Sequence, residues 1–147
     1  MRLPMLALAV LAFSIPATAN EVENKAVIQV INDAYINGVH AKPDAAAMRR
    51  GFHPDFRMLV LTDGKMTAVT LDEWAGRVEK SAASANANAP RPAIKAEFPD
   101  VSVTGNTASV RVEVHRDGRH TFTDYLLLYK FADGWKIVSK AYYAHPR

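Results

Sequence analysis

Apolar and polar residues alternate along the second half of the chain as they do in half-buried β-strands. The alternation is cleanest over 108–115, where Ala and Val take every second position. Further runs rich in β-branched and aromatic residues span 94–104, 121–131 and 135–143. Turn dipeptides separate the runs: Gly105-Asn106, Asp117-Gly118 and Asp133-Gly134. The pattern predicts an antiparallel meander whose first strand bends at Pro99.

The first half of the chain shows the spacing of three and four residues that is typical of helices. Apolar positions recur in this way over 22–35. Asn20 and Glu23 form a candidate capping box at the start of this helix. Gly38 and Pro43 predict its end.

Two further helices are signalled by their first residues. Asp44 is a candidate N-cap for a short helix that stops at Gly51. Thr70 and Glu73 have the spacing of a capping box, and apolar residues follow at helical intervals as far as Ala82. The sequence therefore predicts three helices in all.

One hairpin interrupts these helices. Runs at 56–61 and 66–69 predict two strands joined by a tight turn at Asp63-Gly64, and the Ala-, Ser-, Asn- and Pro-rich segment 81–93 predicts a surface loop. Helices with one hairpin, followed by a meander, predict an α+β fold with the helices on one face of a curved antiparallel sheet. Because no repeat or linker divides the chain, residues 20–147 are expected to form a single domain.

The N-terminal segment has the layout of a secretory signal peptide. Met1-Arg2 supplies a positive start, residues 3–15 are largely apolar, and small residues precede a predicted cleavage after Ala19. The apolar run is shorter than the ~20 residues that a spanning helix needs. Residues 1–19 therefore predict a periplasmic or secreted protein with no stable membrane insertion after cleavage. The alternative is a retained interfacial anchor.

Composition excludes several classes of site. The chain of 147 residues has no cysteine, which excludes disulfides, thiolate zinc sites, iron–sulfur clusters and cysteine nucleophiles. Its 18 basic and 15 acidic residues give a net charge of +3, and the basic residues are spread along the chain. Nucleic-acid binding needs a clustered basic surface, so no nucleic-acid partner is expected.

Turn lengths decide which side chains share a face of the sheet, since a shift of one residue moves a whole strand's set to the other face. A two-residue turn at Asp117-Gly118 predicts that Arg111 lies opposite Asp124 as an ion pair. At the next turn, a loop of three residues sorts polar from apolar positions better than a loop of two, and it places Lys140 opposite Leu126. This register predicts a polar group on one face: Arg111, Asp124, Lys140 and Tyr142.

The ordered segments resemble the nuclear-transport-factor-2-like superfamily, and within it the putative lumazine-binding subgroup. The segments that carry the resemblance are Tyr35-Ile36-Asn37-Gly38, Phe52-His53-Pro54, Leu71-Asp72-Glu73-Trp74, Phe122-Thr123-Asp124-Tyr125-Leu126 and Gly134-Trp135-Lys136-Ile137-Val138-Ser139-Lys140. The resemblance implies a cone-shaped sheet that wraps around a helix and leaves a conical pocket, and dimers that form through the sheet. It also implies a scaffold shared by isomerases, dehydratases, polyketide cyclases and non-catalytic binding modules.

Two charged residues on predicted strands are candidates for a polar site. Asp124 interrupts an apolar strand face, where it would act as a general base or form an ion pair with Arg111 or Lys140 that fixes the register. Lys140 would bind an anion or keep Asp124 ionised, the alternative being a solvated strand lysine.

Aromatic and histidine side chains supply the other candidates. His53 is an acid or base near neutral pH, or else a cap at a helix end. Tyr35 and Trp74 would face a ligand, or else pack in the core. The candidate ligand-binding residues are Tyr35, His53, Trp74, Asp124, Lys140 and Tyr142, with Asp124 and His53 as the catalytic candidates of an enzyme.

The remaining histidines show no spacing typical of metal ligands. They are His40, His115, His120 and His145. His115 and His120 flank a turn, where both are expected to face solvent. The chain also lacks a nucleophile elbow, a phosphate loop and a dinucleotide fingerprint, so neither a metal nor a cofactor is predicted.

These observations favour an exported protein that binds a small, partly apolar molecule that is anionic or planar, and that forms a homodimer. The first alternative is an isomerase or dehydratase with Asp124 or His53 as base and Tyr35 as donor. The second is a dimerising interaction module whose cone is filled by its own side chains.

Overall fold

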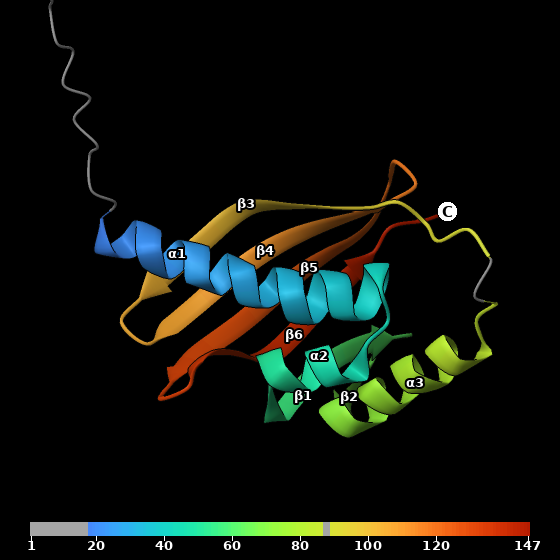
Figure 1. Ribbon diagram of the computed structural model, residues 1–147, viewed down its shortest axis with the longest axis horizontal. Helices are drawn as coiled ribbons and strands as arrows, with labels where there is room; N and C mark the ends of the chain where they lie inside the picture. The colour runs from blue at the N-terminus through green and yellow to red at the C-terminus, as the bar shows by residue number, and fades with distance from the viewer. Residues whose placement is uncertain (1–17, 87–88) are drawn as a thin grey trace, which may run out of the picture.

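Six strands form one curved, open sheet in the computed structural model, which describes residues 18–86 and 89–147 (Figure 1). The strands are β1 (Phe52–Thr62), β2 (Lys65–Thr70), β3 (Ile94–Thr104), β4 (Thr107–Arg116), β5 (Arg119–Phe131) and β6 (Gly134–Ala144). Their order is β2-β1-β6-β5-β4-β3, and every pair is antiparallel except β1 with β6. The predicted hairpin and meander are thereby confirmed.

The helices cover one face of this sheet (Figure 1). They are α1 (Ala19–Val30), the π-helix η1 (Ile31–Ala41), α2 (Ala45–Gly51) and α3 (Leu71–Ser84). Since η1 continues α1, the two form one long helix across the sheet, beside the shorter α2 and α3 (Figure 1). The predicted α+β arrangement, with three helices on one face, is confirmed.

The predicted helix signals are confirmed for α2 and α3. The Asp44 carboxylate accepts hydrogen bonds from two backbone N–H groups at the start of α2. Thr70 and Glu73 form the reciprocal capping box of α3, although the helix extends to Ser84 and so takes in the beginning of the predicted loop.

The predicted start of the first helix is wrong, whereas its predicted end is confirmed, since the helix stops at Ala41, just before Pro43. Thr18 caps it with Glu21, not Asn20 with Glu23, and Glu23 instead accepts a hydrogen bond from the Trp135 indole. The helix also continues through Gly38, because its later part is a π-helix.

The predicted signal peptide falls almost wholly outside the described residues, which begin at 18. Within the described ranges, no helix is both long and apolar enough to cross a membrane.

The predicted ion pair between Arg111 and Asp124 is wrong. Pairing between β4 and β5 shifts by one residue beyond the Asp117-Gly118 turn, so Asp124 lies opposite Val112. This β-bulge moves Arg111 to the outer face, the sheet face that the helices leave uncovered, where it lies 3.9 Å from Glu113.

The predicted position of Lys140 opposite Leu126 is confirmed, but the three-residue loop from which this position was inferred is wrong. Phe131 pairs with Gly134 across a two-residue turn, and a bulge beside Val138 supplies the missing shift. The helix-covered face therefore also holds Trp135 and Ile137.

The core lies between this sheet face and the long helix. The buried strand side chains are Val110, Val112, Val114, Leu126, Leu128, Trp135 and Ile137. Val27, Ile31 and Tyr35 meet them from the long helix. Burial of these apolar side chains stabilises the fold by roughly 1.5–3 kcal/mol for each large residue.

Gly51, at the end of α2, allows close approach to the long helix. A Cβ at this position would lie 2.3 Å from the Ala34 Cβ. We expect Gly51→Ala to lower the free energy of unfolding by about 1–3 kcal/mol, because one helix must move. Urea unfolding measures this change.

Gly76, inside α3, provides the matched control. A Cβ there meets no atom within 4 Å. Gly76→Ala should raise the free energy of unfolding by about 0.5–1 kcal/mol through helix propensity. Equal effects of the two substitutions would contradict the close packing of Gly51.

Candidate functional site

Three polar side chains from three elements meet in the core. Lys140 Nζ on β6 lies 2.8 Å from Asp124 Oδ1 on β5. The Tyr35 hydroxyl, from η1, donates to Asp124 Oδ2 at 2.6 Å and accepts from Lys140 Nζ at 2.6 Å. Lys140, Asp124 and Tyr35 thus form a closed triangle, which we call the buried triad.

The triad is isolated from solvent. The side chains of Asp124 and Lys140 are 0% and 5% exposed, and they are the buried charged residues of the described chain. A lone charge in this environment costs several kcal/mol, so each is tolerated because the other is present. Burial lowers the pKa of Lys140, while the Asp124 carboxylate acts to raise it. Burial is the largest of the causes that raise the pKa of Tyr35 well above its usual value, and the negative charge of Asp124 is the next. The phenol therefore stays neutral.

Lys140 links the triad to a cavity of about 170 Å³. The cavity is lined by Val39, His40, Met58, Trp74, Phe122, Lys140 and Tyr142. The Lys140 Nζ lies 4.8 Å from the ring centroid of Tyr142 and 5.3 Å from that of Trp74, within the range of cation–π attraction. The Lys140 ammonium donates a hydrogen bond to the Tyr35 hydroxyl and lies within ion-pair distance of Asp124 Oδ1, an oxygen without a hydrogen-bond partner among the described residues. The side chain of Lys140 also lines the cavity.

His40 is a cavity residue that sequence reasoning missed. Its ring lies 4.9 Å from that of Tyr35, and its Nε2 atom is buried without a hydrogen-bond partner among the described residues. Burial, with the positive charges of Lys140 and Arg116, lowers the pKa of His40 to about 3. The imidazole is therefore neutral at pH 7.

The π-helix explains why periodicity did not reveal His40. Residues five apart point in different directions on an α-helix of 3.6 residues per turn. In a π-helix the hydrogen bonds join residues five apart, as from the Lys42 N–H to the Asn37 carbonyl at 2.8 Å. The wider turn brings His40 to the same side as Tyr35.

The structure brings five of the six predicted ligand-binding residues together and separates the sixth. Tyr35, Asp124 and Lys140 form the triad, and Trp74 and Tyr142 line the cavity beside it. Asp124 lies behind Lys140 and is not among the lining residues.

His53 is placed elsewhere. Its ring stacks on Phe131 at 4.7 Å, and its Nδ1 accepts a hydrogen bond from the Asp55 N–H at 3.1 Å. Phe131 ends β5, seven residues beyond Asp124. The expectation that His53 joins the pocket is corrected accordingly.

One group on the outer face has the composition of a metal site. Potential ligand atoms of Glu113, His115 and His120 lie within 4.8 Å of one another, and all three residues are half-buried. The expectation that both histidines face solvent is confirmed in part, since both lie on the outer face and both are half-buried. Their rings stack at 4.7 Å. Imidazole and carboxylate are ligands that suit zinc.

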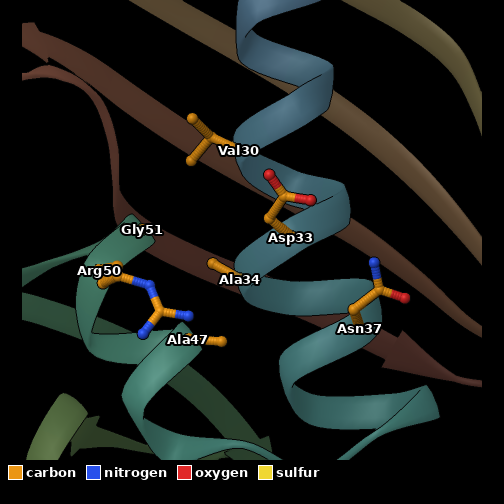
Figure 2. Close-up of a pocket in the computed structure, with 7 residues that line it drawn as sticks. All are labelled: Val30, Asp33, Ala34, Asn37, Ala47, Arg50 and Gly51. Atoms are coloured by element: carbon orange, nitrogen blue, oxygen red, sulfur yellow. The ribbon is translucent and has the colours of Figure 1, made fainter.

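A larger groove of about 370 Å³ lies between the long helix and α2 (Figure 2). Asp33 and Asn37 extend from the long helix and Arg50 from α2, while Ala34 and Gly51 lie between them (Figure 2). The Asp33 carboxylate already accepts a hydrogen bond from Gln29 at 2.9 Å. None of its lining residues belongs to the buried triad or its cavity.

Comparison with known proteins places the chain among proteins of one fold. Residues 22–143 match a family model described as "Putative lumazine-binding". A relative from Cladobotryum sp, named Aldolase FrzH, is 28% identical over 107 residues, which cover 72% of this chain and 80% of that protein.

Solved structures agree with this match. An NTF2-like protein of unknown function from Shewanella baltica OS155 gives a TM-score of 0.71 at 27% identity, covering 90% of this chain and 100% of the other. An NTF-2 like protein of unknown function from Silicibacter pomeroyi DSS-3 gives 0.69 at 23% identity, covering 87% and 100%. The second likeness supports the fold alone.

The neutral state of buried His40 predicts a dependence of stability on pH. The folded pKa of about 3 lies below the ordinary 6.5, so below pH 6.5 the unfolded chain binds a proton that the folded chain does not. Stability therefore falls as the pH falls. Between pH 7 and pH 5 the contribution of His40 is a loss of about 2 kcal/mol.

Urea unfolding of the wild type and of His40→Gln at both pH values measures this contribution. The variant should lose about 2 kcal/mol less than the wild type. Equal losses in the two proteins would show that His40 is not buried in its neutral form.

Proposed function

This chain belongs to the putative lumazine-binding family of nuclear-transport-factor-2-like proteins, and on that premise we propose that it binds a small planar molecule through an electron-rich oxygen. The observation that carries the proposal is Lys140, a buried cation that lines a cavity with aromatic walls and whose ammonium group can donate a hydrogen bond there. The oxygen of the ligand, whether carbonyl or anionic, accepts this charge-assisted hydrogen bond.

The lining favours a planar ligand. Trp74 and Tyr142 present aromatic surfaces, and His40 adds a neutral polar atom. The cavity of about 170 Å³ lies below the ≈ 300–1,000 Å³ of pockets that enclose drug-sized ligands. It therefore holds a very small molecule or one end of a larger one.

Catalysis at a carbonyl group is the second candidate function. Lys140 would stabilise a developing enolate oxygen, and the relative named as an aldolase supports this reading. Asp124 would then set the charge of Lys140 and would not touch the substrate. We rank catalysis second because the described lining of the cavity lacks a strong base at neutral pH. Besides Lys140 and Tyr142, its titratable lining residue is His40, whose pKa of about 3 makes it a weak base at pH 7.

Binding of lumazine, a planar ring with carbonyl oxygens, tests the proposal by calorimetry. The variant Asp124→Asn/Lys140→Met removes both charges together, so no unpaired ion is left in the core. It should bind about 10- to 100-fold more weakly, the value of a hydrogen bond to a charged group. Analysis of the recovered lumazine separates binding from turnover, because a binding protein returns it unchanged.

The matched control is the surface ion pair of Arg49 with Asp72. Arg49→Met/Asp72→Asn makes a similar exchange on exposed side chains and should leave the affinity unchanged. If wild type and triad variant bound equally well, or if the wild type bound no lumazine, the proposed use of Lys140 would be overturned.

We further propose that the chain forms a homodimer through the outer face of its sheet. Four large side chains of β5 and β6 are exposed on this face: Tyr125, Leu127, Tyr129 and Tyr143. A monomer rarely exposes such a contiguous apolar group, which supports a second copy as its occupant. Export directed by residues 1–19 is part of the same proposal and is supported by the sequence layout alone.

Native mass spectrometry of the exported protein tests both points. The mass of one subunit should correspond to a chain that begins at Asn20, and the intact species should be a dimer. Leu127→Glu, at a side chain 49% exposed, should give a monomer. Leu61→Glu, on the other hairpin and 74% exposed, should leave the dimer intact. A dimer in both variants would place the interface elsewhere, and an uncleaved chain would contradict the signal peptide.

A further inference from the structure

A second pocket of about 330 Å³ lies where the β4–β5 hairpin meets the C-terminal segment. It is lined by Arg116, Arg119, Thr121, Phe122, Ala144, His145 and Arg147. Three guanidinium-bearing residues and an imidazole thus surround one space, which we call the arginine pocket. Its size suits a compact polar group.

No Asp or Glu is among the described residues that line this pocket. Among the residues described, no ion pair joins Arg116, Arg119 or Arg147 to a carboxylate. The acidic residue of the hairpin, Asp117, accepts a hydrogen bond from the Ala93 N–H at 2.8 Å. Since arginine is charged at all physiological pH values, the pocket attracts anions.

Arg116 is half-buried and brings one unpaired donor to this end of the sheet. Its Nε atom is buried and has no hydrogen-bond partner in the described part of the chain. A buried donor without an acceptor is costly, so native proteins rarely keep one without reason. An anion in the pocket would supply the acceptor.

The arginine pocket adjoins the cavity beside the triad. Phe122 lines both spaces. Arg116 continues the alternation of Val112 and Val114 and so lies on the helix-covered face, at its end. Its charge also reaches His40, where it contributes to the lowered pKa.

We propose that the arginine pocket binds a phosphate or carboxylate group of the same ligand whose planar end occupies the cavity. The inference rests on the proposed function and narrows it to a planar molecule with an acidic extension. Guanidinium groups match the geometry of both anions through paired N–H donors. The division of the ligand between two spaces accounts for a cavity too small to hold a larger molecule alone.

Titration with inorganic phosphate, followed by amide NMR shifts of the full folded chain, tests the arginine pocket alone. We expect the shifts to centre on the β4–β5 hairpin. Arg116→Gln/Arg119→Gln should weaken phosphate binding about tenfold or more. Arg77→Gln/Lys80→Gln, which removes two exposed charges from α3, should change it less than twofold. Shifts spread over all basic surfaces, or equal weakening in the two variants, would overturn the assignment.

Phenyl phosphate and benzoate test whether the two spaces act together and which anion is preferred. Phenyl phosphate should bind more tightly than inorganic phosphate, since its ring enters the cavity. Asp124→Asn/Lys140→Met should retain both inorganic phosphate and the gain from the ring, because the phenyl ring carries no oxygen for Lys140, whereas the arginine variant should weaken the binding of both phosphates. If phosphate bound but the ring added no affinity, the proposal that one ligand occupies both spaces would be overturned, and the result would count against the proposed function. If no anion bound at all, only the assignment of the arginine pocket would be overturned. Tighter binding of benzoate than of phenyl phosphate would assign the site to a carboxylate.

Discussion

The ion pair between Lys140 and Asp124, closed by the Tyr35 hydroxyl, is the interaction on which the arrangement of this protein depends. It places two opposite charges inside a core that is otherwise apolar, and it links β5, β6 and the long helix. A hydrophobic substitute of the same shape would often be at least as stable. Stability therefore does not explain the triad by itself, and the contact of Lys140 with the cavity supplies a reason for it.

The charges in and around the cavity follow from this arrangement. Asp124 accepts from Tyr35 and balances Lys140, so the pair adds no net charge to the core. His40, at the edge of the same space, is kept neutral by burial and by two nearby cations. Neither Asp nor Glu is among the described residues that line the two spaces, and the pocket beyond Phe122 is lined by three arginines. The described surroundings of both spaces consequently favour ligands with negative or electron-rich groups.

Much of the fold could be predicted from the sequence because its signals are local. The Thr70–Glu73 box and the Asp44 cap act within one helical turn, and the period of two in β4 reports burial on one face. Register was harder to predict, since a β-bulge leaves no strong local signal. The shift between β4 and β5 moved Arg111 out of the predicted polar group, whereas the shift beside Val138 left Lys140 where it was expected. The site itself was partly predictable, because charged residues on apolar strands are conspicuous. His40 was not, because its position depends on the helix type.

The π-helix also bears on how such a cavity can change over evolutionary time. A helix segment with wider turns holds more residues per turn than an α-helix over the same path, so removal of one residue is compatible with a continuous helix. Such a deletion between Tyr35 and His40 would change the angular phase of the residues that follow it and turn His40 away from Tyr35, while the sheet and the triad would stay in place. A single insertion or deletion in this part of η1 would thus exchange residues that line the cavity without moving Lys140 or Asp124. Helix phase, as well as amino-acid substitution, is therefore a route by which this scaffold can acquire new ligand preferences.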